Sequence, residues 1–265
     1  MPEAPPGHVL AAFGVAGSPT RLIGGQGRAW LVADTVLKPC DGPAEWSWLA
    51  EHLPSVRQEG FRLAPAIRTH DGRWVVDGWC AQQAVVGSHR VEGRWLEVLS
   101  ACERFHRHVR HLPEPPFLRD RTDPWSAGDR AAWEDAPSPD HPMIVRLAEA
   151  RRSVSLQPQF IHGDVTENVL FAEGHAPAII DIAPYWRPAG FASAVVVADA
   201  ICWRAADARE LLAAVARIAE FPQLFVRALI YRMTTTVEVS KGAADLRGYA
   251  SAVDLALRLA NDGSA

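Results

Sequence analysis

The chain has 265 residues, and 48% of them are hydrophobic, which is ample for one large domain or two lobes with a sizeable core. Its 27 basic and 31 acidic residues give a formal net charge of −4, which argues against a general nucleic-acid binder and mildly favours a cationic small-molecule partner. No run approaches about 18 apolar residues and no basic-then-apolar segment opens the chain, so neither membrane spanning nor secretion has support, and a cytoplasmic protein is expected.

Four cysteines are spread along the chain without a C-x-x-C pair: Cys40, Cys80, Cys102 and Cys202. This spacing indicates neither a zinc site nor a disulfide framework, so reduced thiols are the expectation. The sequence predicts no particular oligomeric state.

The first segment, residues 1–19, is rich in proline, glycine and alanine, which predicts an irregular arm. Residues 22–32 then place three glycines, Gly24, Gly25 and Gly27, between two strand-like runs. Such a hairpin can lay backbone N–H groups over phosphates, because glycine has no Cβ to keep the chain away. Glycine-rich turns are also common in hairpins that bind nothing, so this feature gains weight only from its neighbours.

A strand and a helix follow the glycine-rich turn and carry two charged candidates. The strand-like run 35–37 leads into Lys38, and a helix is predicted to begin near Ala44 with Glu45 in its first turn. A strand lysine can contact phosphates, and a helix glutamate can hold that lysine in place. The alternatives are a surface lysine and an acid favoured by the helix dipole, with Glu51 as a weaker rival of Glu45.

Short strands and one long helix are predicted next. Residues 64–69 and 73–76 flank a His-Asp-Gly turn and predict a hairpin, and residues 79–86 predict a further strand. Within residues 94–109 apolar side chains recur every three to four positions, which predicts an amphipathic helix.

Residues 112–142 hold seven of the 20 prolines, together with Trp125, Trp133 and several acids. A surface connection is one interpretation of this composition. The other is a substrate-side insertion, because long irregular excursions often bind ligands, and acids beside tryptophans suit a cationic, partly apolar molecule. A short helix is predicted at residues 126–133 with Ser126 as a possible cap.

The stretch 160–171 sets an acid and an amide between two apolar runs. Asp164 and Asn168 lie four residues apart, and Asp181 ends the next apolar run, residues 178–180. This set suits phosphoryl transfer, in which a carboxylate orients the attacking hydroxyl and accepts its proton while an amide oxygen and a second carboxylate hold Mg²⁺. The competing interpretation is a strand–turn–strand in which the acid and the amide are ordinary turn residues.

The remaining sequence predicts mostly helices. One is expected at residues 143–154, and four more at residues 191–205, 207–220, 222–238 and 243–260. Asp199 lies in an apolar run of the first of these four, and a buried carboxylate needs hydrogen-bond donors.

His162, Gly163 and Asp164 resemble the catalytic signature of the aminoglycoside phosphotransferase family, which are small-molecule kinases with a protein-kinase-like fold. Asn168 resembles the metal-binding Asn of that family, and Asp181 resembles the Asp that stands where protein kinases carry Asp-Phe-Gly. In the resembling fold an Asp on the helix that follows accepts hydrogen bonds from the catalytic loop, and Asp199 is the candidate for that role here. The chain departs from the family in one respect, because three residues separate Asp164 from Asn168 where the family usually has four. The four-residue step still spans up to roughly 13–14 Å of extended chain, enough to bring Asn168 to the metal.

The resemblance implies an α+β, two-lobed, protein-kinase-like fold. Residues 1–84 would form an N-lobe with an antiparallel sheet and one helix, and residues 85–265 would form a mostly helical C-lobe. In that family the nucleotide contacts come from the N-lobe. Here they would come from glycines over the phosphates, a lysine on them, a glutamate holding the lysine, and the backbone at the adenine site: Gly24, Gly25 and Gly27, Lys38, Glu45, and residues 81–83.

The implied activity is ATP- and Mg²⁺-dependent phosphorylation of a hydroxyl on a small molecule, with Asp164 as the catalytic base or orienter. The acceptor could be aminoglycoside-like or a metabolite, and fold-level analogy cannot choose between them. The shortened loop motivates an alternative, a catalytically silent protein that binds nucleotide and regulates. A protein kinase is disfavoured, because the sequence has no recognisable activation segment after Asp181.

Overall fold

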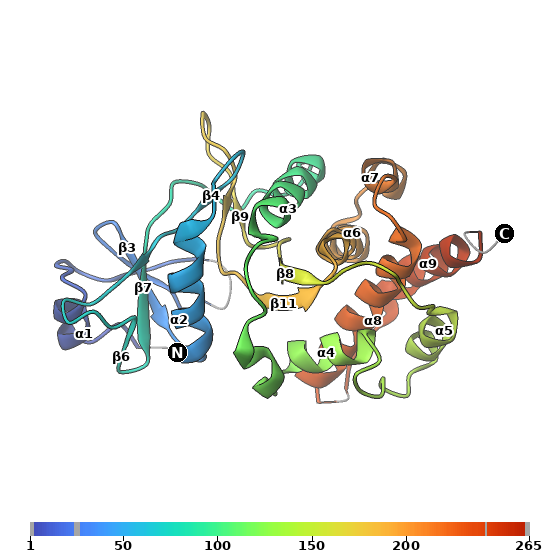
Figure 1. Ribbon diagram of the computed structural model, residues 1–265, viewed down its shortest axis with the longest axis horizontal. Helices are drawn as coiled ribbons and strands as arrows, with labels where there is room; N and C mark the ends of the chain where they lie inside the picture. The colour runs from blue at the N-terminus through green and yellow to red at the C-terminus, as the bar shows by residue number, and fades with distance from the viewer. Residues whose placement is uncertain (1–2, 24–26, 242, 263–265) are drawn as a thin grey trace. The chain divides into compact units, whose positions relative to one another are not determined.

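The computed structural model describes residues 3–23, 27–241 and 243–262. The predictions for Gly24 and Gly25 therefore lie outside the described residues. Figure 1 shows the helices and strands, coloured along the chain. None of the helices in these ranges combines the length and the apolar character that crossing a membrane requires.

Contacts between residues divide the chain into two compact units. The first unit comprises residues 1–90 and 167–181, and the second comprises residues 91–166 and 182–265. Both units are therefore assembled from more than one part of the chain.

The first unit contains an antiparallel sheet whose core is apolar. Its strands are β1 (Thr20–Arg21), β2 (Trp30–Val32), β3 (Thr35–Pro39), β5 (Ala66–Ile67), β6 (Val75–Val76) and β7 (Trp79–Gln83). The strand order is β1-β2-β3-β7-β5, and β6 also pairs with β7. Val32, Leu37 and Ala81 are fully buried at its centre, which gives β3 and β7 their places in the middle of the sheet.

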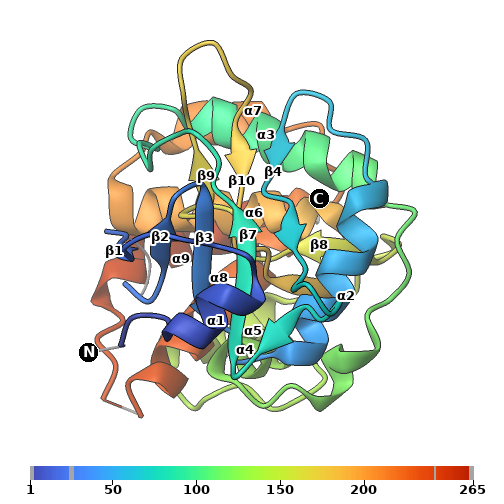
Figure 2. The same ribbon diagram turned by 90° about the vertical axis from the view of Figure 1, so that its left-hand side faces the viewer.

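Two helices accompany this sheet, where the sequence predicted one. Part of the segment expected to be irregular forms α1 (Gly7–Ala12), whose Val9 packs with Phe13 against the buried face of the sheet. Figure 2 shows α1 lying across β3 and β7. The predicted helix is α2 (Pro43–His52), and the 3₁₀ turn η1 (Leu53–Ser55) follows it.

The hairpin predicted from residues 64–69 and 73–76 forms only at its turn. The backbone N–H of Thr69 donates to the carbonyl of Arg73, but β5 and β6 both pair with β7. The cause is the dipeptide Asp77-Gly78, whose residues have φ angles of 46° and 74°. Positive φ at both positions suits a tight two-residue turn that returns β6 onto β7. This Asp-Gly signal is present in the sequence and outweighs the looser His-Asp-Gly turn.

A second, three-stranded sheet brings the distant segment 167–181 into the first unit. Strands β9 (Val169–Leu170) and β10 (Ala178–Ile179) form an antiparallel hairpin, and β10 pairs in parallel with β4 (Arg62–Leu63). Phe171 also bridges Ser88. The contact-based division therefore runs after residue 90 and assigns this hairpin to the first unit, whereas the predicted lobes divide after residue 84 and place the hairpin in the C-lobe.

The second unit is mostly helical and carries one two-stranded sheet. The helices are α3 (Trp95–Val109), α4 (Pro124–Ala132), α5 (Pro142–Ala150), α6 (Ala189–Arg204), α7 (Ala208–Val215), α8 (Phe221–Val239) and α9 (Ala250–Asp262), with 3₁₀ turns η2 (Pro116–Asp120) and η3 (Arg247–Tyr249). Strands β8 (Gln159–His162) and β11 (Pro184–Arg187) pair antiparallel. Helices α6 and α8 are buried along most of their length, and α8 contacts α4, α5, α6 and α9.

Several helix limits differ from the sequence-based predictions. Helix α4 is capped by Asp123, whose carboxylate accepts the backbone N–H of Ser126, so Ser126 is not the cap. Helix α5 ends at Ala150 rather than near 154. Helix α7 ends at Val215, because the chain turns sharply before α8 with Glu220 in a left-handed conformation. Helix α9 begins at Ala250, after η3, rather than near 243.

Helices α4 and α8 approach most closely at Gly128, where a Cβ would lie 2.6 Å from the carbonyl oxygen of Tyr231 and against the hydroxyl of Thr235. We expect Gly128→Ala to lower the free energy of unfolding by about 1–2 kcal/mol, since overpacking costs roughly 1–3 kcal/mol and the gain in helix propensity returns less than 1 kcal/mol. Denaturant unfolding measures the change. Gly248→Ala is the matched control, because no atom lies within 4 Å of the Cβ it would add; equal stability of the two variants would contradict this packing.

Candidate active site

Asp164 follows the end of β8, and the β8–β11 pairing sets its place in the second unit. His162 is opposite Pro184 in the register, and the Gly163 N–H donates to the carbonyl of Ala183 at 2.9 Å. A Cβ on Gly163 would collide with the ring of Tyr185, so only glycine permits this approach. The carboxylate of Asp164 thus emerges, half-buried, from a tightly fixed strand end.

Two buried histidines hold the backbone of this turn. Nδ1 of His162 accepts hydrogen bonds from the N–H groups of Asp164 (3.3 Å) and Ala183 (3.1 Å). The backbone N–H of His162 donates to Nε2 of His106 at 3.0 Å. Nδ1 of His106 lies 2.7 Å from the backbone carbonyl oxygen of Cys102. Burial, followed by the charge of His162, lowers the pKa of His106 to about 3. His106 is therefore neutral, with the proton on Nδ1, and can accept at Nε2.

Arg232 of α8 joins Asp164 to a second buried carboxylate. Its Nη2 donates to Oδ1 of Asp164 at 2.6 Å. Its Nε and Nη2 donate to the two oxygens of Asp199, in α6, at 2.8 and 2.6 Å. Asp199 also accepts the hydroxyl of Thr166 at 2.7 Å. The predicted hydrogen bond between this aspartate and the loop is therefore present, and an arginine that the sequence analysis did not single out lies at its centre.

The charges of this cluster favour an ionised Asp164. Burial raises the pKa of Asp164, but the charge and the hydrogen bond of Arg232 together lower it by more than burial raises it. The pKa of Asp164 therefore lies below its ordinary value. The pKa of Arg232 lies well above its ordinary value despite burial, because Asp199 and Asp164 stabilise its charge. Burial raises the pKa of Asp199 above the ordinary value, although Arg232 opposes this. An ionised but weakly basic carboxylate suits the orientation of an attacking hydroxyl.

Asn168 and Asp181 lie at the same end of the β9–β10 hairpin in the first unit. The carbonyl oxygen of Asn168 accepts the N–H of Ile180 at 2.9 Å, so Asn168 lies opposite the residue that precedes Asp181. Asp181 has a φ of 46°, a left-handed conformation that aspartate tolerates better than most residues. These two side chains supply the hard oxygen donors that Mg²⁺ prefers, and Mg²⁺ usually completes its shell with phosphate oxygens and water. The residues present therefore fit a magnesium ion bound together with a nucleotide.

Lys38 pairs with the same aspartate. Its Nζ, in β3, forms a salt bridge with Oδ1 of Asp181, and it lies 5.2 Å from the ring centroid of Trp46 in α2, within cation–π range. Glu45 is half-buried in the first turn of α2, and its predicted role as the partner of Lys38 stays a prediction. Gly27 has a φ of 62°, and its carbonyl accepts Nε of Arg21 at 2.7 Å.

A cavity of about 250 Å³ lies within the second unit, among η2, α4 and β11. Tyr185, which packs on Gly163, forms part of its wall, so the cavity adjoins the strand end that carries Asp164. The hydroxyl of Tyr185 lies 3.1 Å from that of Tyr231 in α8, which fixes its ring.

No protein-family model and no curated protein matches the sequence. Solved structures do match, over nearly the whole chain. An aminoglycoside phosphotransferase from Alicyclobacillus acidocaldarius subsp. acidocaldarius DSM 446 matches with a TM-score of 0.64 and 16% identity, over 98% of this chain and 97% of its own. A spectinomycin phosphotransferase in complex with ADP and spectinomycin matches with a TM-score of 0.58 and 11% identity, over 96% and 92% of the two chains.

A choline kinase from Streptococcus pneumoniae also matches, with a TM-score of 0.57 and 10% identity over 96% of each chain. At these identities the likeness establishes the fold. The α+β, protein-kinase-like fold that the catalytic stretch led us to expect is therefore confirmed, and this chain has the fold of the aminoglycoside phosphotransferases and related small-molecule kinases.

Proposed function

We propose that this protein is an ATP- and Mg²⁺-dependent phosphotransferase that phosphorylates a hydroxyl of a small molecule. The observation that carries the proposal is the salt bridge between Lys38 and Asp181 at the end of the β9–β10 hairpin where Asn168 also lies. A cation and two oxygen donors from distant parts of the sequence suit a nucleotide phosphate with its metal. The fold shared with a spectinomycin phosphotransferase and a choline kinase supports the same reaction class.

Each residue has a proposed role. Asp164 would accept a hydrogen bond from the acceptor hydroxyl and take its proton, and Arg232 would keep that carboxylate ionised and in place. Lys38 would bind nucleotide phosphates. Asn168 and Asp181 would hold Mg²⁺, which when bound neutralises charge on the phosphate oxygens.

The short loop between the two units bounds this arrangement. Asp164 belongs to the second unit and Asn168 to the first, and only three residues separate them. Their Cα atoms can therefore be at most roughly 13–14 Å apart.

The proposal is tested by incubating the protein with ATP, Mg²⁺ and a panel of hydroxylated metabolites and aminoglycosides, and measuring by mass spectrometry the gain of one phosphoryl group. We expect at least one acceptor to gain it only when ATP is present. ATP binding without any transfer across the panel would favour the silent nucleotide-binding alternative. Failure to bind ATP at all would contradict both.

Lys38 gives a prediction for the nucleotide. We expect Lys38→Met to weaken ATP binding by about tenfold or more while leaving adenosine binding nearly unchanged, because only ATP has phosphates to lose a charged contact. Isothermal titration calorimetry measures both ligands. The chain has one other lysine, so Lys241→Met is a charge-matched control that should bind both ligands as the wild type does. Equal weakening of ATP and adenosine in Lys38→Met would mean that Lys38 is structural.

Asp181 gives a prediction for the metal. In Asp181→Ala we expect Mg²⁺ to lose its strengthening effect on ATP binding, and in Asn168→Ala we expect that effect to shrink. The ratio of ATP affinities with and without Mg²⁺ is the measurement, because it cancels the loss of the Lys38 salt bridge. Glu173→Ala removes an exposed acid from the opposite end of the same hairpin and serves as the control. An unchanged ratio in Asp181→Ala would remove Asp181 from the metal site.

A further inference from the structure

The cavity of the second unit is placed to receive the acceptor. Its walls come from η2 and the residues after it, from α4, and from β11, whose Tyr185 packs on Gly163 beside Asp164. Its volume of about 250 Å³ is just below the range of roughly 300–1,000 Å³ typical of sites for drug-sized ligands. A compact acceptor, smaller than an aminoglycoside, fits such a cavity.

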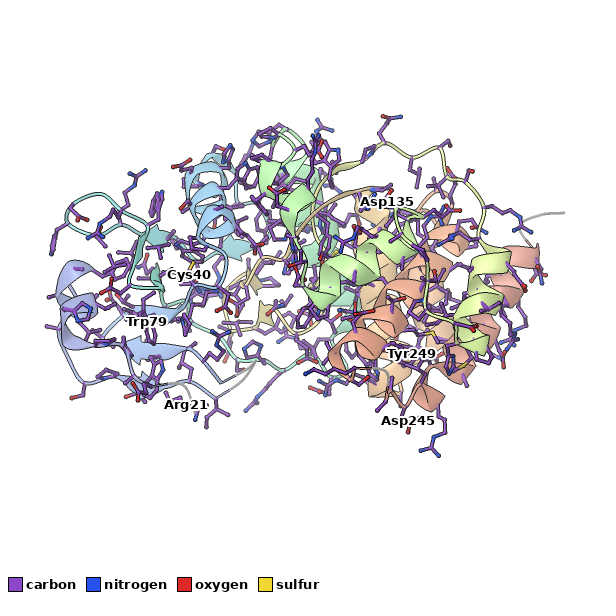
Figure 3. The ribbon with its side chains drawn as sticks, turned by 90° about the horizontal axis from the view of Figure 1, so that it is seen from below. Arg21, Cys40, Trp79, Asp135, Asp245 and Tyr249 are labelled. Carbon is purple, nitrogen blue, oxygen red and sulfur yellow. The ribbon has the colours of Figure 1, made fainter. Side chains whose placement is uncertain are left out.

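Most acids of the segment 112–142 are already paired with arginines. Arg187 of β11 binds Asp129 through Nε (3.0 Å) and Nη2 (2.7 Å), and its Nη2 also binds Asp135 at 2.6 Å. Asp135 follows α4 and is labelled in Figure 3. Arg121 likewise binds Asp123 in a bidentate manner, with Nε and Nη2 at 2.9 and 3.1 Å from the two carboxylate oxygens. A cationic ligand would have to displace these guanidinium groups, so the acids that suggested a cationic acceptor give it little attraction.

Two other arginines face the cavity without a carboxylate. Among the described residues, Arg119 makes no ion pair, and Arg130 donates only Nη1, to the carbonyl of Arg121 at 3.0 Å. Glu114 is the one carboxylate of the cavity wall that has no arginine partner within the described part of the chain. The lining as a whole holds four arginines and three carboxylates, and the charges left unpaired are mainly positive.

Resting on the proposed phosphotransferase activity, we propose that the acceptor is a compact hydroxy compound with an oxyanion group, such as a carboxylate, which Arg119 and Arg130 bind in this cavity. A planar guanidinium presents paired N–H donors that match the two oxygens of such a group. With its anionic end held there, the acceptor would extend its hydroxyl past Tyr185 towards Asp164.

The acceptor oxygen forms a bond to the γ-phosphorus, the bond from that phosphorus to the bridging oxygen breaks, and ADP leaves with the electron pair. The hydroxyl proton passes to the carboxylate of Asp164. The acceptor's own oxyanion keeps its charge throughout and serves only for binding.

The first test measures binding without catalysis. Inorganic sulfate is titrated into the full chain, and binding is followed by NMR at the indole N–H of Trp186. Because Trp186 lines the cavity, its signal distinguishes sulfate bound there from sulfate bound at a nucleotide-phosphate site. We expect saturable shifts in the wild type, and in the double variant Arg119→Gln/Arg130→Gln a Kd raised by at least about tenfold, the effect of losing charge-assisted hydrogen bonds. Arg110→Gln removes an exposed arginine of the same unit away from the cavity and should leave the Kd unchanged.

Glu114→Gln gives a prediction of the opposite sign, because removing the unpaired negative charge should tighten sulfate binding. A merely structural role of these residues would not produce opposite effects. Absence of a shift at Trp186 in the wild type, or a Kd unaffected by the double arginine variant, would overturn the proposal.

The second test compares three acceptors with the same three-carbon frame: glycerate, glycerol and 3-amino-1,2-propanediol, which are anionic, neutral and cationic at neutral pH. With ATP and Mg²⁺, we expect kcat/KM to be at least about tenfold higher for glycerate than for the amine, and this preference to vanish in the double arginine variant. Preference for the amine would overturn the anionic acceptor while supporting the phosphotransferase. Arginine-dependent sulfate binding without transfer to any acceptor, here or in the wider panel, would support the anion site and contradict the proposed activity.

Discussion

Asp164→Asn is expected to lower kcat with the true acceptor by about 10²- to 10⁴-fold, the range contributed by a positioned acid–base group. The amide keeps the shape of the carboxylate but cannot take the hydroxyl proton. ATP affinity should stay the same or improve, because a negative charge near the bound phosphates is removed. The two readouts together separate a catalytic role from a general loss of folding, which would weaken both.

Steady-state kinetics and calorimetry on the same preparation provide the measurement. Glu167→Gln removes an exposed acid from the same loop and should retain turnover. If Asp164→Asn kept more than about a tenth of wild-type kcat, the loss would be smaller than the expected range. Asp164 would then not be the catalytic carboxylate, and Glu167 would be the next candidate. Because Arg232 keeps the pKa of Asp164 below the ordinary value of about 3.9, ionisation of Asp164 should not limit wild-type turnover until the pH falls below about 4.

Arg232→Met is expected to lower the free energy of unfolding by about 3–5 kcal/mol at neutral pH. The reason is that Asp199 is 1% exposed and would lose both hydrogen bonds that it accepts from this guanidinium, while Asp164 would lose the one that it accepts. A buried carboxylate without a cation is costly, whereas methionine itself fills the space well. Denaturant unfolding measures the difference.

The loss should depend on pH in a defined direction. Without Arg232, the folded-state pKa of Asp199 rises still further above that of the unfolded chain, since burial alone remains. A carboxyl group with a raised folded-state pKa contributes stability at low pH and loses it as the pH rises through that pKa. The deficit of Arg232→Met should therefore grow from about pH 4 upward.

Two variants sharpen this second prediction. Arg232→Met combined with Asp199→Asn should recover much of the lost stability and remove its pH dependence, because no unpaired buried charge remains. Arg247→Met removes an exposed arginine, paired with the Asp245 labelled in Figure 3, and should change stability little. An Arg232→Met protein as stable as Arg247→Met would show that the buried cluster carries no such energy.

The candidate residues that the sequence revealed are those that stand beside a recognisable apolar run. Asp164, Asn168 and Asp181 stand at the ends of short apolar strands, so strand periodicity alone brings the last two to one end of a hairpin. Asp199 was found because a carboxylate in an apolar run must find donors. The same reasoning applies to Arg232, which lies in the apolar run after Ala228, and it would have identified that arginine as a buried partner.

Other features depend on pairings that no local pattern specifies. The salt bridge of Lys38 joins it to Asp181, more than a hundred residues later in the sequence. The acids of the segment 112–142 allowed either a surface connection or a site for a cationic ligand, because the sequence does not reveal that Arg187 returns on β11 to bind two of them. The support of His162 by His106 likewise requires knowing that α3 packs against β8.

The parallel pairing of β4 with β10 has a consequence for how the chain is made. Arg62 aligns with Ala178, so β4 leaves the ribosome long before its partner strand exists. At roughly 5–20 residues per second, the partner follows on the order of ten seconds later. During that interval the nascent first unit exposes an unpaired strand edge, of the kind that invites association with other chains. Slower translation between residues 63 and 178 should therefore lengthen the time for which β4 lacks its partner strand, and chaperone supply in that interval should favour soluble protein.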